Sequence, residues 1–120
     1  MCFFRRKRNK KSQINVSFKG EKFDLFRETL ELEMEKFENH PRQELLESEI
    51  YSTLKKYCVA CLFGTIYRSI EMVFAKENGN EILSLVVALS MASDIQKDPN
   101  KKKTLLSMAQ ELQNCHKELI

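Results

Sequence analysis

The chain contains little glycine and little proline, with three and two residues respectively among 120. Segments that stay disordered are poor in hydrophobic residues, whereas here 42% of the residues are hydrophobic. The sequence also lacks a glycine-rich phosphate-binding loop and a Gly-x-Ser-x-Gly nucleophile motif. We therefore expect most of the chain to form one domain with a hydrophobic core of its own.

Long apolar runs are absent too. The longest nearly apolar run, residues 57–67, has eleven residues, and a membrane-spanning helix needs about 18. The run predicts a buried helix instead. Residues 1–4 are too short for the apolar region of a secretory signal, so we expect a cytoplasmic, reducing location in which the cysteines are free thiols.

Histidine is scarce, and His40 and His116 are the two in the chain. A ferritin-like di-iron bundle needs a glutamate three residues before a histidine on each of two helices. The residues three positions before His40 and His116 are Phe37 and Gln113, and neither is a glutamate. The sequence therefore excludes that class of metal protein.

Cys58 and Cys61 have the two-residue spacing of redox pairs and zinc sites. They lie within an apolar run and not at a helix start, so we expect their pKa values to be raised. A zinc site would need two more ligands, and only Cys115 with His116 is available at a distance. Buried hydrophobic residues are the favoured interpretation, and a thiol redox or zinc-binding protein acting through Cys58 and Cys61 is an alternative.

What the chain does have is strongly segregated charge. Residues 1–22 carry eight lysines or arginines and one glutamate, whereas residues 23–50 carry nine acids and three bases. The formal net charge of +3 therefore hides two opposed regions. We predict a basic flexible arm over residues 1–20 and a helical domain over residues 21–120.

The arm is suited to bind polyanions, because six cations lie within residues 5–11. Such a segment binds nucleic acid without reading its sequence, and it binds anionic lipid with about 1 kcal/mol per cation. Phe3 and Phe4 favour a membrane surface over nucleic acid, and a solvated tail without a partner is the alternative. Three further lysines open the last predicted helix, where the helix dipole disfavours them. The predicted anion-binding residues are Arg5, Arg6, Lys7, Arg8, Lys10, Lys11, Lys101, Lys102 and Lys103.

Apolar residues recur at spacings of three and four along most of the chain. This period predicts helices over residues 21–39, 41–77, 81–97 and from 99 onward. In the third helix, Val87 and Met91 lie beside the inward-facing residues.

The second predicted helix would span about 55 Å, nearly twice the length of its neighbours. It must therefore break near Gly64 or bury its overhanging half in another copy of the chain. Residues 14–18 alternate like a strand, but no second strand is predicted to pair with them. The predicted fold class is all-α, an antiparallel bundle of four to five helices with a basic extended N-terminal arm.

The preferred function is a non-enzymatic interaction or regulatory module. Its arm would contact an anionic surface, and its helices would bind a protein partner, most simply a second copy in a homodimer. The alternative enzyme is a metal-dependent phosphohydrolase, because glutamates three or four residues apart can converge on a divalent cation. Its ligands would be Glu31, Glu35, Glu44 and Glu47. The sequence indicates no cofactor, no bound metal and no small-molecule substrate.

Overall fold

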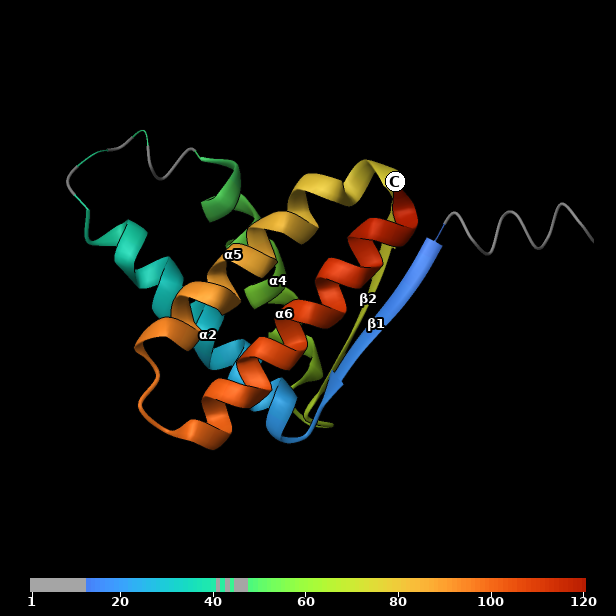
Figure 1. Ribbon diagram of the computed structural model, residues 1–120. Coiled ribbons are helices and arrows are strands. Elements are labelled where there is room, and N and C mark those ends of the chain that lie inside the picture. The colour runs from blue at the N-terminus through green and yellow to red at the C-terminus, as the bar shows by residue number, and fades with distance from the viewer. Residues whose placement is uncertain (1–12, 41, 43, 45–47) are drawn as a thin grey trace, which may run out of the picture.

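Four helices and a two-stranded sheet make up the part of the chain that the computed structural model describes, residues 13–40, 42, 44 and 48–120 (Figure 1). The elements are β1 (Gln13–Lys19), α2 (Glu21–Glu38), α4 (Glu49–Gly64), β2 (Ser69–Ala75), η1 (Lys76–Asn78), α5 (Gly79–Ile95) and α6 (Pro99–Leu119). The element η1 is one turn of 3-10 helix that joins β2 to α5.

Helices α2, α5 and α6 confirm three of the predicted helices to within about two residues at each end. The start of α6 illustrates why such boundaries are readable. The Asp98 carboxylate accepts hydrogen bonds from the backbone N–H groups of Asn100 and Lys101, at 2.9 and 3.4 Å, and Pro99 takes the first helical position.

The prediction of an all-α bundle is wrong, because the second predicted helix ends at Gly64 and the chain returns as a strand. In β2 the side chains of Ile70, Met72 and Phe74 are buried, and those of Glu71 and Val73 are exposed. That alternation has the period of two that a strand with one buried face requires. The fold is mostly helical with a small antiparallel sheet.

Strand β1 pairs with β2, so the expectation that residues 14–18 have no strand partner is also wrong. The pairing is antiparallel and runs from Gln13 opposite Ala75 to Lys19 opposite Ser69. Val16 and Phe18 point to the same buried face as the apolar residues of β2. Figure 1 shows the sheet beside α6, with helices on its buried side. Two strands that lie far apart in the sequence thus cover one side of the core.

Gly64 is needed where α4 ends. A Cβ atom at this position would lie 1.9 Å from the backbone oxygen of Ser69, so any larger residue would force the chain apart. Gly20 joins β1 to α2 with a φ of 62°, in the left-handed region that favours glycine. Its N–H donates a hydrogen bond to the backbone oxygen of Arg68 at 2.8 Å. This bond connects the turn between β1 and α2 to the turn between α4 and β2.

The core lies between the inner faces of the helices and the inner face of the sheet. Its largest completely buried side chains are Phe18, Phe23, Phe26, Phe74, Leu30, Leu54, Ile82, Leu85, Leu89, Leu105, Met108 and Leu112. Within the described residues, none of the helices has the length and apolar character needed to cross a membrane. Residues 1–12 of the predicted arm lie outside the described part, and residues 13–19 form β1.

Candidate interaction surface

Helix α5 is apolar on its outer face as well as on its inner face. Every exposed position between Glu81 and Ser93 carries a hydrophobic side chain, namely Leu83, Val87 or Met91. These residues are 40%, 42% and 49% exposed and lie four residues apart, so they form one row along the helix. A surface helix normally places polar residues on its outer face, and a helix that is apolar all round is normally buried. The outer row of α5 is therefore a candidate contact surface.

An apolar groove of about 210 Å³ lies alongside this row. Val87 and Met91 form one wall, and Phe37 of α2 with Ile50 and Leu54 of α4 forms the others. The aromatic ring of Phe37 is kept in place by Tyr51, whose ring centroid lies 5.9 Å away. The groove widens the apolar surface beyond one helix. We call the row and its groove the α5 face, which consists of Phe37, Ile50, Leu54, Leu83, Val87 and Met91.

Charges are present at the ends of the α5 face. Lys56, with 56% of its side chain exposed, lies near the N-terminal end, where it pairs with Glu81. Asp94 is exposed at the other end. At the edge of the groove, Lys36 and Glu33 form an ion pair of 2.6 Å on α2. The outer row itself carries no charge between Glu81 and Asp94.

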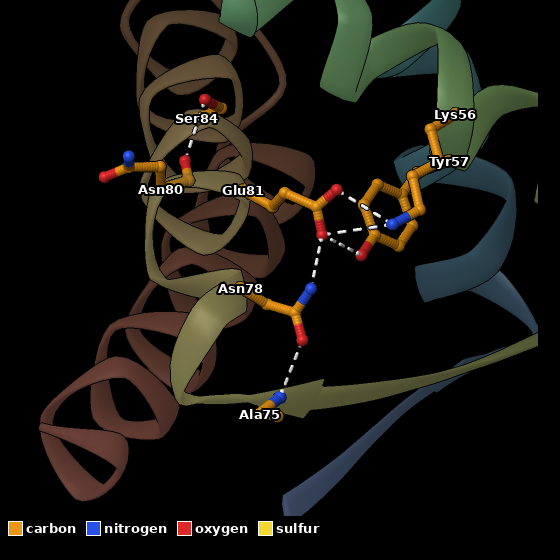
Figure 2. A network of polar contacts seen from close by, with 7 residues as sticks. All are labelled: Lys56, Tyr57, Ala75, Asn78, Asn80, Glu81 and Ser84. Carbon is orange, nitrogen blue, oxygen red and sulfur yellow. Dashed lines mark hydrogen bonds and ion pairs between the residues drawn. The ribbon is translucent and has the colours of Figure 1, made fainter.

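The N-terminal end of α5 is fixed by a network of hydrogen bonds around Glu81 (Figure 2). The Glu81 carboxylate accepts from Lys56 Nζ at 2.8 and 3.1 Å, from Tyr57 Oη at 3.2 Å and from Asn78 Nδ2 at 2.9 Å. Asn78 Oδ1 in turn accepts from the backbone N–H of Ala75 at 2.8 Å. One carboxylate therefore joins α4, η1 and α5, which sets the position of the α5 face relative to α4.

The same network shifts two pKa values. Burial raises the pKa of Tyr57 above its ordinary value, and the neighbouring Glu81 carboxylate raises it further. Burial acts to raise the pKa of Glu81 as well, but the donors Lys56, Asn78 and Tyr57 together lower it below 4.5. Tyr57 is thus held protonated as a donor and Glu81 ionised as an acceptor, which is the pattern of a structural clamp.

The predicted anion-binding residues are only partly within the described chain. Those of the arm, Arg5, Arg6, Lys7, Arg8, Lys10 and Lys11, lie outside it. Lys101, Lys102 and Lys103 are exposed in the first two turns of α6. Lys101 borders a depression that it shares with acidic residues of α2 and with Asp98. The acids of that depression are Glu21, Asp24, Glu28 and Asp98.

The glutamates of the predicted metal site have separate surroundings. Glu31 pairs with Arg27 at 2.9 Å, and Glu44 pairs with Arg42. Glu35 is exposed on α2, and Glu47 lies outside the described residues. No group of three metal-ligating side chains comes together among the residues with a described position.

The cysteines of the predicted redox or zinc site are held in α4. Cys61 is completely buried, and burial raises its pKa to about 12, with a further contribution from the neighbouring Cys58. Burial also raises the pKa of Cys58, and Glu31 adds to that shift. Both are free thiols, as is the buried Cys115. A raised pKa disfavours the thiolate that redox chemistry and metal binding need.

Comparison of the chain with models of protein families, with curated proteins and with solved structures finds no match. The interpretation of the α5 face therefore depends on its own chemistry. Sequence reasoning noted Val87 and Met91 beside the inward residues of the third helix but did not recognise them as exposed. The signal that could have identified them is the absence of charged residues between Glu81 and Asp94, which leaves the helix without the charged outer face of an ordinary surface helix.

Proposed function

We propose that the protein is a non-enzymatic interaction module that forms a homodimer through the α5 face and contacts an anionic surface through its basic arm. The observation that carries the proposal is the apolar outer row of α5, where Leu83, Val87 and Met91 take every exposed position over three turns. Apolar area that remains in water is favourably buried by association, at about 25 cal/mol per Å². Exposed apolar patches of this kind mark interaction sites.

A second copy of the chain suits this face better than an unrelated charged partner. A two-fold axis across the middle of α5 would set two outer rows antiparallel, so that Val87 lies at the axis and Leu83 of one copy faces Met91 of the other. No like charges meet along the row, because it is uncharged between Glu81 and Asp94. The same axis brings Asp94 of one copy to the end at which Lys56 and Glu81 of the other form an ion pair, so a cation is present there beside an acid. The apolar row is thus complementary to itself.

The test is a pair of matched substitutions, Val87→Lys and Val73→Lys, examined by light scattering and sedimentation over a concentration series. Val87 lies in the α5 face and is 42% exposed, whereas Val73 lies on the outer face of the sheet and is 53% exposed. We expect Val87→Lys to weaken dimerisation at least about tenfold, because a lysine charge would be buried against an apolar surface. Val73→Lys should leave dimerisation unchanged. Equal dimerisation by both variants would refute the proposed interface.

The second part of the proposal is supported by the cations of residues 5–11. Its test replaces Arg5, Arg6, Lys7 and Arg8 by glutamine in the full-length chain. Binding to phosphate-rich surfaces is measured with anionic vesicles and with duplex DNA over a range of salt concentrations. We expect the unmodified protein to bind and to lose affinity as salt rises, and the variant to bind much less at every salt concentration. Unchanged binding by the variant would show that the arm is not the contact.

A further inference from the structure

A second exposed apolar surface lies where α4 ends and the chain turns into β2. Leu62 and Phe63 extend from the last turn of α4, and Ile66 and Tyr67 from the turn that follows. Their exposed fractions are 58%, 84%, 87% and 83%. Single exposed apolar residues are ordinary, but four within six residues form a patch that needs an explanation. We call Leu62, Phe63, Ile66 and Tyr67 the apolar wedge.

The base of the apolar wedge is held firmly although its side chains are exposed. Thr65 donates a hydrogen bond from Oγ1 to the backbone oxygen of Cys61 at 3.0 Å. Arg68 donates its backbone N–H to the oxygen of Thr65 at 3.2 Å and accepts from the N–H of Gly20. Its guanidinium also forms an ion pair with Asp24. A turn pinned in this way presents its apolar side chains outward without the entropic cost of ordering a loop on binding.

Basic residues accompany the apolar wedge along the chain, because no acidic residue lies between Glu49 and Glu71. In space, two of these bases, Lys56 and Arg68, form ion pairs with Glu81 and Asp24, so the exposed lysines Lys55 and Lys19 are the relevant cations. Lys55 is exposed on α4 about 10 Å before the wedge, at 1.5 Å per residue. Lys19 is exposed and lies opposite Ser69 in the sheet, and Ser69 follows Tyr67 by two residues. Lysines flanking the wedge can reach phosphate groups while their stems cover apolar surface.

We propose that the apolar wedge inserts into the headgroup boundary of a lipid bilayer that contains anionic lipid. Phe63 and Tyr67 are aromatic residues of the kind that favours this boundary, where one end of the ring is apolar and the other is hydrated. Leu62 and Ile66 add aliphatic surface that insertion would bury, and Lys19 and Lys55 supply the cations that anionic headgroups attract. This proposal identifies the anionic surface, which the proposed function left open, as a lipid bilayer. It therefore rests on the anionic-surface part of the proposed function and not on the homodimer.

The wedge is tested directly with Tyr67→Trp, because the chain has no tryptophan of its own and the new residue is then the only indole fluorophore. Full-length protein is mixed with vesicles of phosphatidylcholine containing phosphatidylserine, and with phosphatidylcholine vesicles alone. We expect a blue shift of tryptophan emission, and quenching by lipids brominated near the headgroup, with the anionic vesicles. Emission that stays unchanged while the protein binds the vesicles would overturn the proposal.

A matched pair of substitutions adds a measurement of binding. Ile66→Ser changes a side chain that is 87% exposed in the wedge, and Ile120→Ser makes the same change at a site that is 80% exposed. Neither side chain contributes to the core, so both variants should fold. We expect Ile66→Ser to weaken partitioning onto anionic vesicles about tenfold and Ile120→Ser to have little effect. Equal partitioning by both variants would overturn the wedge.

The glutamine variant of the arm separates failure of the wedge from failure of the proposed function. If the arm variant loses vesicle binding while Ile66→Ser keeps it, the arm is the contact and the wedge proposal is refuted. If Ile66→Ser loses binding while the arm variant keeps it, the wedge is supported and the role of the arm is refuted. If Ile66→Ser lowers the mass of the particle and leaves vesicle binding intact, the wedge is a contact between protein copies, and the lipid proposal is refuted.

Discussion

Replacing Glu81 by glutamine should weaken the clamp that holds α5 against α4. The carboxylate accepts four hydrogen bonds from three side chains, those of Lys56, Tyr57 and Asn78 (Figure 2). Glutamine keeps the length of the side chain but removes its charge, and its amide nitrogen is a donor that would face other donors. The substitution therefore tests whether a charged acceptor is needed at this position.

The expected loss of stability follows from the exposure of each partner. Lys56 has 56% of its side chain exposed, so its ion pair with Glu81 contributes about 0.3–1 kcal/mol. The hydrogen bonds from Tyr57 and Asn78 contribute about 0.5–1.5 kcal/mol each. We therefore expect Glu81→Gln to lower the free energy of unfolding by about 2 kcal/mol. At about 4 °C per kcal/mol for a chain of this size, the melting temperature should fall by about 8 °C.

The assay is urea unfolding followed by circular dichroism, with Glu77→Gln as the control. Glu77 is an exposed glutamate four residues before Glu81, and its substitution should change the free energy of unfolding by less than about 0.5 kcal/mol. A loss of less than about 0.5 kcal/mol in Glu81→Gln would show that a charged acceptor at this position is not needed for stability.

The stability that Glu81 contributes should depend on pH, and the direction of that dependence follows from its lowered pKa. Because its donors lower the pKa of Glu81 in the folded protein below its ordinary value of 4.5, the ionised carboxylate stabilises the fold above that pH. This stabilisation is lost as the pH falls from 4.5 through the lower folded value. The difference in stability between the unmodified protein and Glu81→Gln should therefore shrink on acidification. A difference that grows toward acid would contradict the assignment.

Two further predictions concern α4. Gly64→Ala should lower the free energy of unfolding by about 1–3 kcal/mol in urea titrations, because its Cβ would lie 1.9 Å from the Ser69 oxygen; a neutral effect would show that the turn relaxes freely. Cys61 should resist a thiol reagent at mildly alkaline pH until the protein is denatured, because it is completely buried and its pKa is raised to about 12. Rapid labelling of native Cys61, located by peptide mapping, would contradict its burial.

Much of the helical structure could be predicted from local signals. Spacings of three and four on one face located α2, and the Asp98-Pro99 pair located the start of α6. The strand β2 was missed because Ile66, Ile70, Val73 and Phe74 also fit a helical spacing. A short apolar run does not distinguish helix from strand by period alone, and only pairing with a strand some 50 residues away resolves it.

The candidate surfaces were harder to predict, because a sequence shows which residues are apolar but not which of them tertiary contacts cover. Ile95 continues the apolar period of the third predicted helix, which would place it inward, yet it is 67% exposed. Phe63 lies in the run that predicted a buried helix, and it is 84% exposed because the chain turns away one residue later. Exposure of this kind depends on where elements end in space, which is set by features such as the close approach of Gly64 to Ser69.

The most direct test of the central claim, that the α5 face joins two copies of the chain, is the mass of the unmodified protein measured by sedimentation equilibrium over a wide concentration range. The chain has a mass of 14.1 kDa. We expect a particle of twice that mass at the higher concentrations, which dissociates to single chains on dilution. A mass of 14.1 kDa at every concentration would contradict it.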